Sequence, residues 1–113
     1  MATTTYTPSS YLSDANPLVT LLNADVTAQN YSPAAERFRY YFHTVQVIAP
    51  SGGSATLFGS LDGVSWVPVS AAATAMNDGA LVSVNGAYRY LIAQRSNDTN
   101  PVTVILQSSQ SVR

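Results

Sequence analysis

The apolar residues of this chain fall into short runs that alternate with polar residues, and glycine, proline or asparagine separates the runs. Val102, Val104 and Leu106 alternate with Thr103 and Gln107, which is the period-two pattern of a β-strand with one buried face. No stretch has the period of an amphipathic helix. We therefore expect an all-β chain of about seven strands, folded as an antiparallel β-sandwich. The expected strands cover residues 17–22, 38–49, 55–61, 64–69, 80–84, 87–93 and 101–107.

Two turn signals predict hairpins. Asp62-Gly63 suits a two-residue type I′ turn, in which both turn residues need positive φ. Counting outward from it puts Gly59 opposite Trp66, so that the single Trp would cover a strand glycine. Asn85-Gly86 is the same kind of signal, and it predicts that 80–84 pairs directly with 87–93.

The run 38–49 carries large apolar groups on both expected faces. Phe38, Tyr40 and Phe42 fall on one side, and Tyr41 and Val45 fall on the other. A strand with one solvated face alternates more cleanly than this. Part of this strand is therefore expected to be covered twice, either by a loop of the same chain or by another subunit.

The two ends of the chain differ from its middle. Residues 1–16 are polar apart from Tyr6, Tyr11 and Leu12, and we expect an extended N-terminal arm that is either disordered or ordered on a neighbouring subunit. Residues 17–107 form the expected sandwich domain, and 108–113 form a polar tail. The alanine-rich segment 70–76 is expected to be a loop across the end of the sandwich.

Composition narrows the class of protein. At 113 residues the chain fits one domain. Charged residues make up 10% of it, against about 25% in an ordinary soluble domain. It has no Lys, and the polar residues are chiefly 14 Ser, 11 Thr, 7 Asn and 5 Gln. This is either an ordinary Ser/Thr-rich β-protein or a surface that meets other subunits, where charged groups would be costly to desolvate.

Charge and hydropathy argue against nucleic acid and membranes as partners. Five Arg are scattered at positions 37, 39, 89, 95 and 113, and the net charge is −1, so no basic footprint for nucleic acid is expected. No run approaches the ~20 apolar residues of a membrane span, and the N-terminus lacks the basic and apolar regions of a signal peptide. We therefore expect neither export nor a membrane anchor.

The supply of catalytic groups is small. There is one His, one Glu, no Cys and no Lys, and we do not expect an enzyme, a cofactor or a metal. His43 has no acidic neighbour in sequence, which favours a packed histidine over a general base. Asp62, Asp78 and Asp98 suit turns, with calcium ligation the alternative. Trp66 and the tyrosines suit a core or an interface, with a carbohydrate platform the alternative.

Two motifs carry a resemblance. Gly59-Ser60-x-Asp62-Gly63-x-x-Trp66, followed by Gly86-x-Tyr88-Arg89-Tyr90-Leu91, resembles a signature of jelly-roll and discoidin-like sandwiches, over roughly residues 54–107. Similar domains occur in bacteriophage virions as capsid decoration (cement) proteins, head fibres and tail or baseplate modules, and related sandwiches in secreted enzymes bind carbohydrate.

The resemblance implies a virion structural protein that cements a bacteriophage head, with a jelly-roll fold and a homotrimeric state. Its expected partners are itself and the major capsid protein or other virion proteins. A tail, fibre or baseplate module that binds host carbohydrate is the alternative.

The apolar excess of the strands 38–49 and 87–93 favours association independently of that resemblance. Aromatic and Arg side chains are the anchors that interfaces favour. The candidate interface residues are Tyr6, Tyr11, Arg39, Tyr40, Tyr41, His43, Tyr88, Arg89 and Tyr90.

Overall fold

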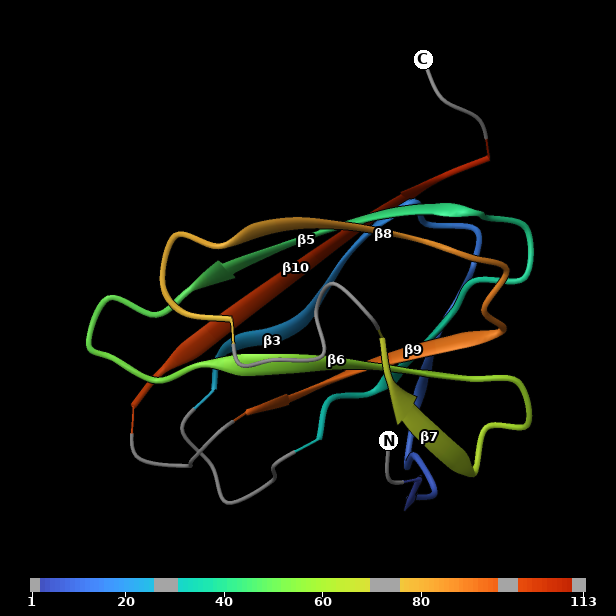
Figure 1. The fold of residues 1–113 in the computed structure, drawn as a ribbon, viewed down its shortest axis with the longest axis horizontal. Helices are drawn as coiled ribbons and strands as arrows, with labels where there is room; N and C mark the ends of the chain where they lie inside the picture. The colour runs from blue at the N-terminus through green and yellow to red at the C-terminus, as the bar shows by residue number, and fades with distance from the viewer. Residues whose placement is uncertain (1–2, 26–30, 70–75, 96–99, 111–113) are drawn as a thin grey trace.

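The computed structural model describes residues 3–25, 31–69, 76–95 and 100–110. In these ranges the chain forms ten strands and no helix, arranged as a two-layered sandwich (Figure 1). This confirms the expected all-β sandwich. The strands are β1 (Thr4–Thr5), β2 (Tyr11–Leu12), β3 (Leu18–Asp25), β4 (Ala34–Glu36), β5 (Phe42–Ile48), β6 (Ala55–Ser60), β7 (Ser65–Pro68), β8 (Leu81–Asn85), β9 (Tyr90–Arg95) and β10 (Val102–Ser109).

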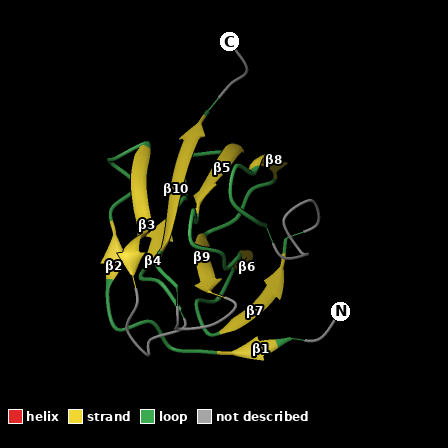
Figure 2. Ribbon diagram, turned by 90° about the vertical axis from the view of Figure 1, so that its left-hand side faces the viewer, coloured by secondary structure: helices red, strands yellow, loops and turns green. Residues whose placement is uncertain are grey.

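The two sheets differ in size. The larger has the strand order β1-β7-β6-β9-β4-β2, and the smaller has the order β3-β10-β5-β8 (Figure 2). Neighbouring strands are antiparallel except for β2 and β4, which are parallel. The main core lies between the sheets, where alternate residues of the long strands meet. It includes Val45, Val47, Leu57, Leu91, Val104 and Leu106, which are all buried completely.

A second, smaller cluster lies on the other face of the six-stranded sheet, which we call its outer face. Ala34, Phe58, Trp66 and Ile92 form this outer cluster. Phe58 and Ile92 alternate with core residues of β6 and β9, as the period of a strand requires. Both faces of this sheet therefore bury apolar groups within one chain.

The first expected hairpin exists, but its register is wrong by one residue. Gly59 pairs with Val67 and not with Trp66, which leaves a four-residue loop, 61–64, in place of a two-residue turn. Gly63 has φ +78°, as expected, whereas Asp62 does not have positive φ. The Asp62 side chain explains the longer loop, because its Oδ1 accepts hydrogen bonds from the amides of Val64 (2.9 Å) and Ser65 (2.8 Å).

The second expected hairpin is wrong. β8 pairs with β5 in the four-stranded sheet, whereas β9 pairs with β6 and β4 in the other sheet. The Asn85-Gly86 turn therefore carries the chain from one layer to the other. A local turn signal fixes a change of direction, but the strand partner is decided by burial of Val82 and Val84 beside β5.

The expected long strand 38–49 is also shorter than predicted. β5 begins at Phe42, and residues 38 and 39 form a turn. Strand β4, Ala34–Glu36, is not among the expected strands. Ser108 and Ser109, expected in the polar tail, are the last residues of β10. Most of segment 70–76, and Asp98, lie outside the described residues.

The N-terminal arm lies on its own chain. β1 pairs with β7 at one edge of the six-stranded sheet, and β2 pairs with β4 at the other. Between these strands Tyr6 stacks on Tyr31 at 4.5 Å, and both pack on the outer cluster. The backbone carbonyl of Tyr6 accepts a hydrogen bond of 2.8 Å from Nε1 of Trp66. The arm therefore helps to bury the single Trp.

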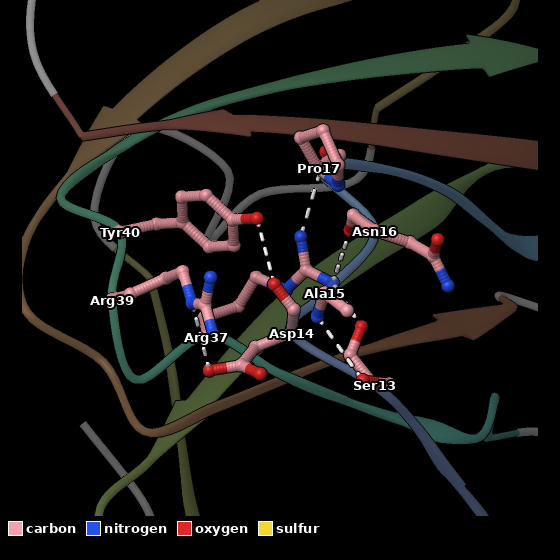
Figure 3. Close-up of polar contacts among 8 residues, drawn as sticks. All are labelled: Ser13, Asp14, Ala15, Asn16, Pro17, Arg37, Arg39 and Tyr40. Carbon is pink, nitrogen blue, oxygen red and sulfur yellow. Dashed lines mark hydrogen bonds and ion pairs between the residues drawn. The ribbon is translucent and has the colours of Figure 1, made fainter.

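A buried arginine holds the end of the arm (Figure 3). The Nη2 of Arg37 donates to the carbonyls of Asn16 (2.9 Å) and Ser13 (3.3 Å), and the hydroxyl of Tyr40 donates to the carbonyl of Asp14 (2.7 Å). The guanidinium also lies over the Tyr40 ring, 5.0 Å from its centre. These bonds satisfy backbone carbonyls of loop 13–17 that no strand pairs.

Candidate functional site

Four side chains from three segments meet at one edge of the outer face, and we call them the aromatic patch: Tyr11, Phe38, Arg89 and Tyr90. The rings of Tyr11 and Phe38 lie 5.6 Å and 5.5 Å from the ring of Tyr90. The Arg89 guanidinium carbon lies 4.7 Å above the ring of Phe38. Tyr11 and Phe38 remain 47% and 49% exposed, so a partner can reach both side chains.

The position of the patch follows from strand pairing. Tyr90 begins β9 and lies between Ser60 of β6 and Glu36 of β4. Its ring also faces the loop 61–64, where a Cβ on Gly63 would lie 3.3 Å from Cε2 of Tyr90. Glycine at this place lets the loop lie against the ring. The sheet and the loop together therefore fix the central ring of the patch.

The loop 61–64, whose Gly63 lies against the Tyr90 ring, carries a permanent negative charge. Hydrogen bonds from the amides of Ser65 and Val64, and then from the Ser60 hydroxyl, hold the pKa of Asp62 at about 2, below its ordinary value of 3.8. Asp62 is thus ionised at any physiological pH. With Arg89 nearby, the patch offers ring stacking, a cation and a carboxylate, which suits recognition more than bond-making chemistry.

The structure divides the nine candidate interface residues among four places. Tyr11, Arg89 and Tyr90 share the aromatic patch, and Tyr6 covers Trp66. Tyr40 is buried beside Arg37, and the exposed Arg39 forms an ion pair of 3.4 Å with Asp14. Tyr41, His43 and Tyr88 lie near the Gly86 crossover, where Tyr41 is exposed and His43 is buried.

His43 has fixed partners inside the sandwich. Its Nε2 lies 3.1 Å from the carbonyl oxygen of Gly86, which can only accept, so Nε2 carries the proton. Nδ1 therefore accepts from the Ser108 hydroxyl, 2.8 Å away. Burial lowers the pKa of His43, an effect that the Gly86 bond opposes. The pair resembles a base and a nucleophile, but both side chains are buried, and the arrangement serves packing.

A shallow hollow of about 290 Å³ lies between the β6–β7 hairpin and Tyr88. It is mostly apolar, and its walls include Val67, Pro68 and Val69. Among the described residues, no group of three or more His, Asp or Glu side chains is placed to hold a metal ion. No helix in these ranges has the length and apolar character to cross a membrane.

Sequence reasoning missed Phe38 as a site residue. It was assigned to the long strand, where it would share a face with Tyr40, but the turn at 38–39 brings it to Tyr90 instead. The signal that could have identified it is that Arg37 and Arg39 lie on either side of it in sequence. A buried strand residue rarely has a cation on both sides, so this pattern favours an exposed turn at Phe38.

No protein-family model matches this chain, and no curated protein matches it. Among solved structures, it is similar to the SPBc2 prophage-derived protein YomS, with a TM-score of 0.66 and 11% identity over 81% of this chain and 91% of that one. It is also similar to part of the IMPa metallopeptidase, solved in complex with T-antigen, with a TM-score of 0.50 and 12% identity over 93% of this chain and 13% of the peptidase. The PBSX exported protein XepA matches with a TM-score of 0.45 and 14% identity, over 99% of this chain and 39% of that one. At these identities the first two similarities show the fold alone.

Proposed function

We propose that this protein is a structural component of a bacteriophage particle, and that it decorates the capsid by binding the major capsid protein through the aromatic patch. The observation that carries the proposal is the patch itself, in which two rings are about half exposed and a third is fixed between them. Exposed aromatic and Arg side chains are typical anchors of protein interfaces. A decoration protein needs such an anchor and needs no catalytic centre.

Two further observations support the phage origin. YomS is prophage-derived, and the similarity covers 81% of this chain and 91% of that one. Strands β3 to β10 also divide four and four between the sheets, and we infer from this the jelly-roll that the sequence motifs suggest.

Particles of the phage that encodes this chain can test the decoration role. Capsids that lack the protein are expected to rupture at a lower temperature or milder osmotic shock, and adding the purified protein is expected to restore them. Phe38→Ser removes an exposed ring of the patch and should abolish the rescue. Val67→Ser, which changes an exposed apolar residue of β7 outside the patch, should rescue normally. Equal robustness with and without the protein would contradict the role.

A tail, fibre or baseplate module that binds host carbohydrate is the second candidate. The specific observation in its favour is that the patch combines two half-exposed rings with a cation, Arg89, and that the loop against Tyr90 carries the carboxylate of Asp62. Sugars stack on rings and use such groups for their hydroxyls. A glycan array on which wild type binds and Tyr11→Ser does not would favour this candidate, and a blank array would favour decoration.

A further inference from the structure

Uncharged side chains form the outer face of the four-stranded sheet. Its residues alternate with the core residues of the same strands, including Val19, Val45 and Val104. Among the side chains that the structure describes on this face, none is charged. We call this set the uncharged face: Leu18, Thr20, Phe42, Thr44, Gln46, Ile48, Leu81, Ser83, Asn85, Thr103, Ile105, Gln107 and Ser109.

The register of the strands places these residues in rows. One row runs Thr20, Ile105, Gln46 and Leu81, from β3 to β8. The next runs Leu18, Gln107, Thr44 and Ser83, where the hydroxyls of Thr44 and Ser83 lie 3.3 Å apart. The middle of the face is therefore formed by two exposed glutamines, a threonine and an isoleucine.

The two outer faces of the sandwich differ in what covers them and in their charge. Tyr6 and Tyr31 pack on the outer face of the six-stranded sheet, where the aromatic patch also lies. At one end of the uncharged face the Tyr41 ring packs edge-on against Phe42, 5.0 Å between ring centres. At the other side of the face Leu81, in the edge strand, is 69% exposed. The charged side chains that the structure describes lie in loops or on the six-stranded sheet: Asp14, Glu36, Arg37, Arg39, Asp62, Asp78, Arg89 and Arg95.

We propose that the uncharged face binds the same face of a second copy of this chain, related by a two-fold axis. Hydroxyl and amide groups both donate and accept hydrogen bonds, so such a face can pair with itself. A two-fold contact brings the residues near its axis close to their own equivalents, and a face without charge avoids like-charge repulsion there. A charged partner would find no complementary charge to fix its orientation. The arrangement is independent of the proposed role in the virion.

The size of the face sets the strength of the contact. Four strands spaced by about 4.8 Å and about seven residues long cover roughly 450 Å². Two copies would then bury about 900 Å², which is below the roughly 1,200 Å² of stable interfaces and within the range of transient ones, so we expect dissociation constants on the order of micromolar or weaker. The dimer should therefore form and dissociate with concentration.

The dimer would place one aromatic patch on each outermost layer of a four-layered stack. It could then contact two partners at once, which suits a protein that links neighbouring subunits. The resemblance to virion proteins favours three copies, whereas this face favours two, and a mass measurement separates them.

Sedimentation velocity of the full chain from about 1 μM to about 500 μM tests the proposal over the range expected for an interface of this size. Wild type should move from monomer to dimer. Gln46→Arg and Gln46→Glu, each in the middle of the face, should stay monomeric, and an equal mixture of the two should recover dimers because opposite charges then meet across the axis. Asn77→Arg and Asn77→Glu, in an exposed loop outside the face, serve as the matched controls and should dimerise like wild type.

Three results would overturn the proposal. They are a wild type that stays monomeric throughout, a trimer mass, and Gln46 variants that associate as wild type does. Because Gln46 is exposed, its variants should keep the melting temperature of wild type. If one does not, Gln107→Arg on the neighbouring strand provides the same test.

Discussion

The ring of Tyr88 lies directly against the backbone of Gly59 in β6, where a Cβ would come within 2.8 Å of Cδ1 of Tyr88 and 3.2 Å of Val69. The aromatic cover that the sequence suggests for this glycine therefore exists, but Tyr88 supplies it and not Trp66. The contact joins the loop before β9 to the β6–β7 hairpin, beside the shallow hollow.

Gly59→Ala is expected to destabilise the fold by about 1–3 kcal/mol, because a methyl group cannot enter this contact without moving the ring. Chemical denaturation provides the measurement. The same substitution in a Tyr88→Leu background should cost clearly less than in wild type, since the smaller side chain leaves room. Equal costs in both backgrounds would mean that Tyr88 is not the obstacle.

The loop 61–64 depends on the Asp62 oxygen and on the backbone of Gly63. Asp62→Asn should leave the melting temperature almost unchanged, because an amide oxygen can accept the same bonds, whereas Asp62→Ala should lower it. Gly63→Val should cost about 1–3 kcal/mol, because a β-branched residue resists positive φ. If Asp62→Asn removed binding without changing stability, Asp62 would be a ligand-binding residue.

The arm controls the environment of the single Trp. Trp66 is fully buried in the intact chain, and its Nε1 donates to the carbonyl of Tyr6. Removing residues 1–8 takes away Tyr6 and this carbonyl, so Trp66 should become exposed. Its fluorescence should shift to longer wavelength, and the melting temperature should fall. Tyr6→Leu keeps the carbonyl and should shift the emission less. An unchanged spectrum after truncation would show that the arm does not cover Trp66.

Stability should also depend on pH through His43. Its pKa is lowered in the folded state, so the unfolded chain binds the proton more readily. The free energy of unfolding should therefore be highest above pH 6.5, the pKa of His43 in the unfolded chain, and should fall as the pH drops below that value. Thermal melts between about pH 7.5 and about pH 4.5 avoid the separate loss that Asp62 causes at lower pH. His43→Gln should flatten the curve in this window, and an unchanged slope would assign it to another group.

Local patterns predicted the strands well but their partners poorly. The alternation of Val102, Val104 and Leu106 identified β10, because a strand with one buried face has apolar residues at every second position. The Asn85-Gly86 turn does not form the predicted hairpin, because pairing between residues as distant in the chain as Val45 and Val82 leaves no local signature. In the first hairpin a single carboxylate, Asp62, lengthened the loop and moved the register by one residue.

Only part of the aromatic patch could be predicted, because local sequence does not show which aromatic residues are buried. Composition and aromatic excess singled out Tyr11, Arg89 and Tyr90, which do meet in the aromatic patch. Tyr40 and His43 looked equally suitable from sequence, but the buried Arg37 network and the Ser108 bond place them inside the chain. These bonds join residues far apart in sequence, and no local spacing indicates them.

The most direct test of the proposed function is the protein composition of gradient-purified particles made by a phage genome that encodes this chain. Quantitative mass spectrometry should find the protein at a fixed copy number relative to the major capsid protein. A genome that carries Phe38→Ser should yield particles from which the protein is missing, while Val67→Ser leaves the ratio unchanged. Particles that contain none of the wild-type protein would contradict a structural role in the virion.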